Sequence, residues 1–150
     1  MGLKALRAFL QRHRRIALDS SVFIYQVEAN PRYIDLTDPI FVWLNRPNRT
    51  AVTSTITMTE VLVPAYRMGG EDRVDPFYGL LTAYTSLDWI APTLEIADIA
   101  ARIRAAHRLR TPDALQAATA LHSGAAGLIT NDPVFERVQG VETLVLERLL

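Results

Sequence analysis

Short runs of apolar and β-branched residues alternate with longer stretches of helical periodicity along the 150 residues of this chain. Such runs predict the strands of a parallel sheet, because a strand covered by helices on both faces buries its side chains on both sides. The predicted strands lie at 16–18, 50–56, 87–90, 125–130 and 141–146. Strands that alternate with helical segments in this way are typical of βαβ units.

The stretches between the strands repeat apolar residues at a spacing of three and four, which indicates helices with one buried face. The predicted helices cover 22–27, 34–44, 57–68, 74–84, a segment that starts at Thr93, and 113–122. The chain has the length of one typical domain and contains no repeat or low-complexity linker. We therefore predict an α/β fold, a three-layer α/β/α sandwich with a five-stranded parallel sheet, formed by residues 16–150.

Residues 1–15 form a basic extension before the first predicted strand. Leu3, Leu6 and Leu10 recur there at helical spacing, with arginines beside them. This pattern predicts an amphipathic helix that packs on the domain. An arm that contacts phosphate groups is the alternative interpretation.

Composition limits the classes of function. Apolar residues make up 49% of the chain and charged residues 21%, which is typical of a globular protein. The absence of Cys excludes a disulfide framework, Cys-ligated zinc and thiol catalysis. No apolar stretch is long enough to span a bilayer, and the basic N-terminus lacks the apolar core of a secretory signal. We expect a cytoplasmic protein that does not associate with membranes.

Sixteen basic side chains balance sixteen acidic ones, and every basic residue except Lys4 is arginine. The planar guanidinium group matches the geometry of a phosphate. If a metal site holds four of the acids, the rest of the surface carries an excess of positive charge. Overall neutrality therefore does not exclude a face that binds nucleic acid.

Four acidic residues follow predicted strands or lie near the start of the helices beside them. Asp19 directly follows the first strand, and Glu60 lies near the start of the helix after the second strand. Asp113 begins an Ala-rich helix, and Asp132 follows the strand at 125–130. Because ligands of open α/β sheets bind beyond the carboxyl ends of the strands, we expect these acids to converge there.

Each acid alone also has a purely structural explanation. The segment 57–60 has the Thr-x-x-Glu pattern of a capping box. The segment 111–113 combines an N-cap threonine, a proline at the first helical position and an acid favoured by the helix dipole. Asp19 fits a helix cap, and Asp132 fits a turn.

Together the four acids point to a metal. Like charges that converge repel one another unless a cation neutralises them. Carboxylate oxygens without Cys or a neighbouring His favour Mg²⁺ or Mn²⁺ over zinc or copper. A metal held in this way activates water and orients a phosphate, so the acids predict hydrolysis of phosphodiesters.

Four segments resemble, in the same order, the four motifs of PIN-domain ribonucleases, and most closely those of the VapC toxins. They are IALDSSVFIY at 16–25, STITMTEVL at 54–62, RTPDALQAATAL at 110–121 and LITNDPVF at 128–135. The similarity covers roughly residues 16–147. Its most specific parts are the Pro-Asp-Ala-Leu and Thr-Asn-Asp segments.

The resemblance implies a PIN-like fold and assigns roles to the acids. Asp19, Asp113 and Asp132 would ligate the metal, directly or through water. Glu60 would complete the site or orient the attacking water, so that all four form the catalytic group. The resemblance also implies supporting roles for two hydroxyl residues, Ser20 and Thr130.

One departure from the family lies beside the first acid. Many relatives have Asn where Ser21 stands, so an amide near the site is absent. Its role is lost or taken over by the Ser21 hydroxyl.

For function, the resemblance implies a Mg²⁺- or Mn²⁺-dependent endoribonuclease that leaves a 3′-hydroxyl, and the toxin of a toxin–antitoxin pair. It implies a cognate antitoxin whose C-terminal segment occupies the acidic groove. It also implies homodimers or dimers of dimers.

Four arginines are candidate RNA contacts, because arginine bonds phosphate oxygens with paired N–H groups. They are Arg14, Arg15, Arg108 and Arg110. For the last two, a solvated helix end is the structural alternative. Five aromatic residues in apolar patterns are expected in the core or a subunit interface: Trp43, Tyr66, Phe77, Tyr78 and Trp89.

Two other enzyme classes with acids at strand ends do not fit. A response-regulator receiver needs a lysine near the acidic pocket, and Lys4 is the only lysine. A haloacid-dehalogenase-type phosphatase needs a second Asp where Ser21 stands. Two alternatives stay open: a PIN-like module that binds RNA or protein without cutting, and a housekeeping RNA-processing nuclease.

Overall fold

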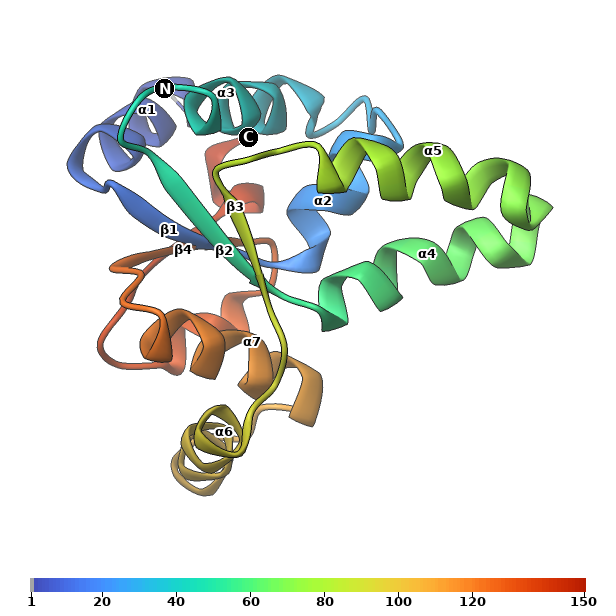
Figure 1. Cartoon of the computed structure of the whole chain (residues 1–150). Helices are drawn as coiled ribbons and strands as arrows, with labels where there is room; N and C mark the ends of the chain where they lie inside the picture. Colours follow the sequence, from blue (N-terminus) through green and yellow to red (C-terminus); the bar gives the residue numbers. More distant parts are fainter. Residues whose placement is uncertain (1) are drawn as a thin grey trace.

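A computed structural model describes residues 2–150, which form one sheet of five parallel strands flanked by helices (Figure 1). The strands are β1 (Arg15–Leu18), β2 (Thr50–Ser54), β3 (Leu87–Ile90), β4 (Gly127–Thr130) and β5 (Glu142–Val145). The α-helices are α1 (Gly2–Arg12), α2 (Ser20–Val27), α3 (Ile34–Leu44), α4 (Ile56–Gly69), α5 (Glu71–Thr82), α6 (Leu94–Ala106) and α7 (Thr111–His122). Two short 3₁₀ helices follow, η1 (Pro133–Arg137) and η2 (Leu146–Leu149). The predicted α/β class and five-stranded parallel sheet are confirmed.

The order of the strands reverses at β1. It is β3-β2-β1-β4-β5, and every neighbouring pair is parallel. The chain builds outward from β1 to β3 and then returns to the other side of β1 with β4. Connections therefore leave β1 and β4 in opposite directions, and ligands of open α/β sheets bind beyond the carboxyl ends of the strands at such a point.

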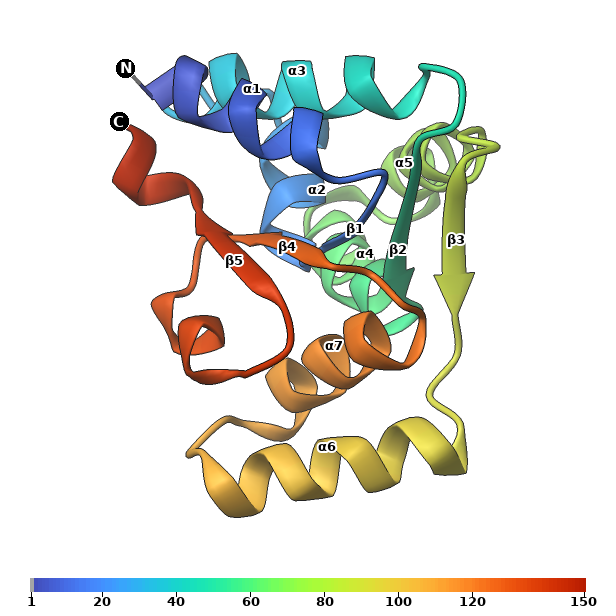
Figure 2. The same ribbon diagram turned by 90° about the vertical axis from the view of Figure 1, so that its left-hand side faces the viewer.

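Helices cover both faces of this sheet. The helices α1 and α3 lie over one face, and α6 and α7 lie over the other (Figure 2). Each face has its own apolar cluster, which includes Phe9, Phe23 and Ile40 on the first face and Ile96 and Phe135 on the second. The helices α4 and α5 form a hairpin that projects beyond the sheet (Figure 1).

Some element ends differ from the predictions where a turn replaces regular structure. The strand predicted at 50–56 ends at Ser54, because Thr55 already turns the chain into α4. The helix predicted at 74–84 covers Glu71–Thr82 instead. Gly70 has a φ of 62°, a conformation that suits glycine, and this lets α5 begin directly after α4.

The helix α1 is part of the core. Leu6 and Phe9 are fully buried, and the indole Nε1 of Trp43 donates a hydrogen bond to the Leu10 carbonyl at 2.9 Å. The helix contacts α3 and η2. The division of the chain at residue 15 stays a prediction. No helix within residues 2–150 has the length and apolar character that a bilayer crossing requires.

The contact between α1 and β4 gives a test of this packing. A Cβ at Gly127 would lie 2.6 Å from the Phe9 Cζ atom and 3.0 Å from the His13 Cδ2 atom. We expect Gly127→Ala to lower the free energy of unfolding by about 1–3 kcal/mol, the usual cost of overpacking. Urea denaturation of the purified variant measures the change.

Gly79→Ala is the matched control. Gly79 lies inside α5, and a Cβ there meets nothing within 4 Å. Because alanine is the better helix former, this variant should gain up to about 1 kcal/mol. Equal stability of Gly127→Ala and the wild type would contradict the packing of α1 on β4.

Candidate functional site

Asp19 lies at the centre of the site. It follows Leu18, the last residue of β1, and caps α2, so that its Oδ1 accepts the Ser20 backbone N–H at 2.7 Å. Its Oδ2 accepts the Thr130 hydroxyl at 2.7 Å. Only 7% of the residue is exposed. Two neighbouring elements thus fix the carboxylate at the C-terminal edge of the sheet.

The adjacent strand β4 contributes the next acid. Thr130, the last residue of β4, is fully buried, and its Oγ1 accepts the Asp132 backbone N–H at 3.0 Å while it donates to Asp19. Asp132 caps η1, because its Oδ1 accepts the Val134 N–H at 3.0 Å. A single hydroxyl therefore ties the Asp132 turn to the Asp19 carboxylate.

Glu60 reaches the site from α4. Its Oε2 accepts the Ser20 hydroxyl at 2.8 Å. The capping box expected at 57–60 is wrong: α4 begins at Ile56, and its N-cap makes no side-chain cap bond. The Thr57 hydroxyl is buried in a different hydrogen-bond network, described below. Glu60 thus faces the site instead of its own helix start.

Asp113 lies in the first turn of α7, where the sequence placed it. The N-cap is Arg110 and not the expected Thr111. The Arg110 Nε donates to Asp113 Oδ2 at 3.3 Å, and the Asp113 side chain is 15% exposed. The acid therefore has a cationic partner from the preceding loop.

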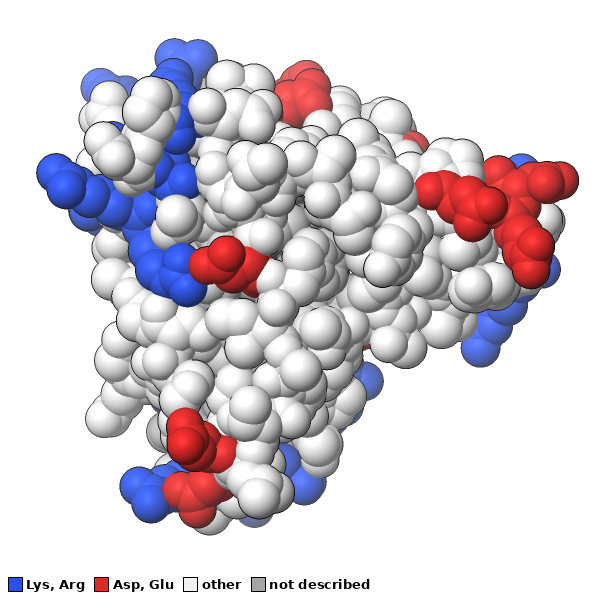
Figure 3. Space-filling view, viewed as in Figure 1, with Lys and Arg blue, Asp and Glu red and all other residues white. Residues whose placement is uncertain are grey.

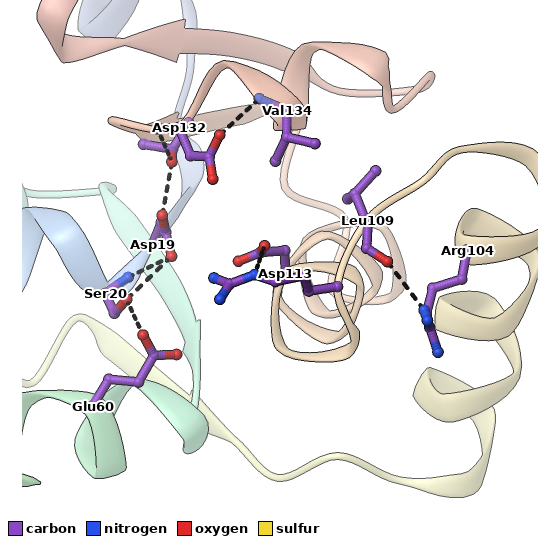
Figure 4. Close-up of polar contacts among 10 residues, drawn as sticks. Asp19, Ser20, Glu60, Arg104, Leu109, Asp113, Asp132 and Val134 are labelled. Carbon is purple, nitrogen blue, oxygen red and sulfur yellow. Dashed lines mark hydrogen bonds and ion pairs between the residues drawn. The ribbon is translucent and has the colours of Figure 1, made fainter.

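The four acids lie close together at the ends of the strands. Figure 4 shows Asp19, Glu60, Asp113 and Asp132 around one space beside the ends of the strands. Burial raises the pKa of Asp19 to about 6, against hydrogen bonds from Thr130 and Ser20 that lower it. The negative charges of Glu60 and Asp113 raise this pKa further. The arrangement therefore favours the uptake of a proton or a cation.

The donors suit a hard divalent cation, although their present positions do not form a closed ligand set. All four side chains offer carboxylate oxygens, the preferred ligands of Mg²⁺ and Mn²⁺. Within residues 2–150, no three His, Asp or Glu side chains are grouped so that they could hold a metal as they stand. The carboxylate of Asp113 is bonded to Arg110, and the carboxylate of Glu60 is bonded to the Ser20 hydroxyl. Asp19, Asp113 and Asp132 would hold a cation after these partners rotate away.

A buried polar network behind the acids was not predicted from the sequence. The Thr53 Oγ1 donates to the Leu18 carbonyl at 2.8 Å and lies 2.6 Å from the Thr57 Oγ1. Gln116 donates to Thr57 at 2.7 Å and accepts the Ser54 N–H at 3.3 Å. The network joins the end of β1, β2, α4 and α7, the elements that carry Asp19, Glu60 and Asp113. A glutamine among the buried alanines of α7 was its one sequence signal.

Two further residues near Asp19 connect the loops. The Ser21 hydroxyl lies 3.5 Å from Asp19 Oδ2 and accepts the Asn131 N–H at 3.2 Å. The Asn131 side chain donates to the Tyr25 hydroxyl at 2.8 Å and accepts the Glu147 N–H at 2.7 Å. Ser21 therefore takes a place beside the carboxylate, and an amide is supplied nearby by Asn131, which sequence analysis missed.

The candidate RNA contacts fall into two groups. Arg14 and Arg15 lie at the N-terminal end of β1, at the opposite edge of the sheet from the acids. The Arg15 guanidinium binds Asp88 at 3.0 Å and the Ser123 carbonyl at 2.8 Å. Arg108 and Arg110 are exposed in the loop before α7, beside Asp113. Their contact with RNA stays a prediction.

The predicted position of the aromatic residues is confirmed in part. Trp43 is buried, and Phe77 and Trp89 are partly buried. Tyr66 and Tyr78 are 56% and 52% exposed on the α4–α5 hairpin, so their assignment to the core is wrong. For these two, only the subunit interface stays a prediction.

The fold and the site define this chain as a small α/β protein with an open parallel sheet. Its four acids lie where the order of the strands reverses. The model of the PIN domain matches residues 16–141, most of the chain. The chain therefore belongs to the PIN domain family. The comparison with curated proteins finds no match.

Solved structures of VapBC toxin–antitoxin systems have the same fold. VapBC2 from Rickettsia felis, bound to a promoter DNA fragment, matches with a TM-score of 0.68 and 15% identity over 87% of this chain and 98% of that one. VapBC-1 from nontypeable Haemophilus influenzae matches with a TM-score of 0.68 and 22% identity, over 89% of this chain and 98% of that one. VapC20 from Mycobacterium tuberculosis, a sarcin–ricin loop cleaving toxin, matches with a TM-score of 0.67 and 18% identity, over 85% of this chain and 97% of that one. At these identities the likeness establishes the fold.

The raised pKa of Asp19 leads to a pH-dependent difference in stability. The unfolded chain loses the Asp19 proton near pH 3.8, whereas the folded chain keeps it until about pH 6. The cost of the buried charge therefore grows as the pH rises from about 4 to 6 and persists above that range. In EDTA, we expect the free energy of unfolding of Asp19→Asn, relative to that of the wild type, to rise by about 3 kcal/mol between pH 3 and pH 7.5, since one unit of pKa shift corresponds to about 1.4 kcal/mol.

This pH-dependent difference should vanish below about pH 3, where both states of the wild type are protonated, and urea denaturation across pH checks this. Asp75→Asn is the matched control, because Asp75 is exposed on α5 and should change stability by less than about 0.5 kcal/mol. A difference in stability between Asp19→Asn and the wild type that does not change with pH would contradict the electrostatic account.

Proposed function

We propose that this protein is a Mg²⁺- or Mn²⁺-dependent endoribonuclease of the VapC type, the toxin of a toxin–antitoxin pair. The observation that carries the proposal is the convergence of four carboxylates at the reversal of strand order in a PIN domain. The raised pKa of Asp19 supports a site that gains from a bound cation. The likeness in fold to a toxin that cleaves the sarcin–ricin loop supports RNA as the substrate.

The proposed roles follow from the contacts of each residue. Asp19, Asp113 and Asp132 would hold the metal. Thr130 positions Asp19 and Asp132 relative to each other, because its hydroxyl donates to the Asp19 carboxylate and accepts the Asp132 N–H. Glu60 orients the attacking water and receives its proton. Ser20 positions Glu60 through its hydroxyl and Asp19 through its backbone N–H.

When bound, Mg²⁺ or Mn²⁺ would polarise the phosphate and activate the attacking water. The side chains arrange the rest. Arg110, which pairs with Asp113 here, is placed to turn toward the RNA phosphate once Asp113 binds a cation. The 80% exposure of the Arg110 side chain leaves it room for this rotation. Arg108 adds positive charge beside it.

We further propose a cognate antitoxin and a homodimer or dimer of dimers. The similar structures include VapBC complexes from Rickettsia felis and Salmonella typhimurium, both bound to DNA, and FitAcB from Neisseria gonorrhoeae. Exposed apolar side chains on the α4–α5 hairpin, among them Tyr66 and Met68, support a protein partner on this side.

Cleavage of RNA tests the proposed function. The substrates are an oligonucleotide with the sarcin–ricin loop, total transfer RNA and an unstructured 20-mer, each with Mg²⁺, Mn²⁺ or EDTA. We expect metal-dependent cleavage of at least one substrate. Asp113→Asn should reduce its rate by more than 100-fold, because the substitution removes a carboxylate that holds the metal.

Asp98→Asn is the control for a lost carboxylate on the same side of the sheet. Asp98 is 62% exposed on α6 and pairs with Arg102 on the same helix, so its variant should cleave at the wild-type rate. Cleavage that survives Asp113→Asn would overturn the catalytic assignment. Binding of RNA without cleavage in any metal would favour the non-catalytic module instead.

A further inference from the structure

A cavity lies away from the acids, between α1 and α3. We call it the α1–α3 groove; its volume is about 380 Å³, a size typical of ligand sites. Arg7 lines it from α1, and Arg46 and Arg49 line it from the connection between α3 and β2. This connection joins the N-terminal end of β2. The groove therefore opens at the edge of the sheet opposite the acidic site.

The groove is basic, and its charges are not neutralised. None of the ion pairs formed within residues 2–150 involves Arg7, Arg46 or Arg49. One carboxylate, Asp38, also lines the groove and accepts a hydrogen bond from the Gln26 Nε2 at 2.8 Å. Three guanidinium groups against one carboxylate leave an excess of positive charge. Figure 3 shows Lys and Arg side chains gathered over this side of the molecule.

Arg49 carries the strongest indication of a ligand. Its Nε atom is buried and has no hydrogen-bond partner within residues 2–150. Its Nη1 reaches only the carbonyl of Asn48, at 3.3 Å. A buried N–H group without an acceptor is costly, and a cationic one more so. Arg49 lines the groove, so an anionic oxygen bound there would give its guanidinium group an acceptor.

The floor of the groove is apolar. Leu10, Val42 and Trp43 contribute to it, and the indole N–H of Trp43 is already bonded to the Leu10 carbonyl. The floor therefore offers apolar contact to a ligand, while the arginines at the rim offer charge-assisted hydrogen bonds. A sugar or base with a phosphate on each side has this combination of surfaces.

We propose that the α1–α3 groove binds the phosphate backbone of the RNA substrate at a distance from the acidic site. This proposal rests on the proposed ribonuclease function. Planar guanidinium groups favour phosphate over the carboxylates of an acidic peptide only modestly, but the apolar floor fits a nucleoside better than an acidic side chain. The groove therefore holds one part of the RNA while another part lies at the acids.

The two sites are close enough for one RNA to reach both. The five residues of β2 run from the groove toward the acids and span roughly 16 Å at the usual rise of a strand. Single-stranded sites on domains of similar size cover about 4 to 16 nucleotides. Remote contacts of this kind raise affinity and position the substrate without taking part in the reaction.

RNA binding in EDTA tests the groove without cleavage. The probe is a fluorescein-labelled 20-mer of uridine, followed by anisotropy from 50 to 300 mM salt. We expect Arg46→Gln/Arg49→Gln to weaken binding about tenfold. The slope of log K against log salt should fall by about 1 to 1.5, since each lost phosphate contact removes about 0.7. Arg7→Gln, at an exposed position, should weaken binding by roughly threefold, a change smaller than one full phosphate contact.

Arg67→Gln is the matched control, because Arg67 is exposed at the far end of α4. Thermal unfolding shows that each variant is folded. We expect Arg67→Gln to bind the 20-mer like the wild type. If the groove variants also bind it like the wild type, the groove proposal is wrong. Equal displacement of the 20-mer by a 20-residue poly-aspartate would also overturn it, since charge alone would then explain binding.

Hydrolysis of bis(p-nitrophenyl) phosphate with Mn²⁺ separates this proposal from the ribonuclease function. This small diester cannot reach both sites, so the groove variants should hydrolyse it at the wild-type rate. If the wild type hydrolyses the diester and the groove variants bind RNA normally, only the groove proposal fails. If the wild type neither hydrolyses the diester nor binds RNA, the proposed function fails and the groove proposal with it.

Discussion

The constraint on which the rest of this structure depends is the gathering of four carboxylates at one edge of a parallel sheet. The burial of Asp19 and its repulsion by Glu60 and Asp113 oppose folding without a cation, as the pKa of about 6 for Asp19 indicates. The fold withstands this cost through neutral donors. Thr130 and Ser20 bond Asp19 directly, and the buried Thr53–Thr57–Gln116 network holds the elements behind it.

Topology explains why the acids meet although they are far apart in the sequence. Neighbouring strands β1 and β4 end side by side at the reversal of strand order, which places Asp19 beside Asp132. The adjacent strand β2 leads into α4 and Glu60, while α7 leads into β4 and begins near the same edge with Asp113. At the opposite edge the same layers leave a groove lined by arginines. The four acids and the three arginines of the groove therefore lie at opposite edges of the sheet.

The sequence predicted much of this arrangement because its strongest signals are local. Apolar runs and helical spacing identified all five strands, and the order of acids after strands placed the site at their ends. The prediction of a capping box failed because a side chain has a partner from a distant element: Thr57 bonds Gln116 and not Glu60. The groove was beyond prediction for the same reason, since Arg7 and Arg49 meet only after α1 packs on α3.

Thermal unfolding with Mn²⁺ tests most directly whether the four acids act as one metal site. A ligand that binds only the folded state adds about 2.7 kcal/mol of stability at a hundredfold excess over its Kd, so even a weak site is visible at millimolar metal. The account predicts a clear rise in the Tm of the wild type and of Asp98→Asn, and none in Asp113→Asn. A wild type that does not respond, or an equal rise in all three proteins, would contradict it.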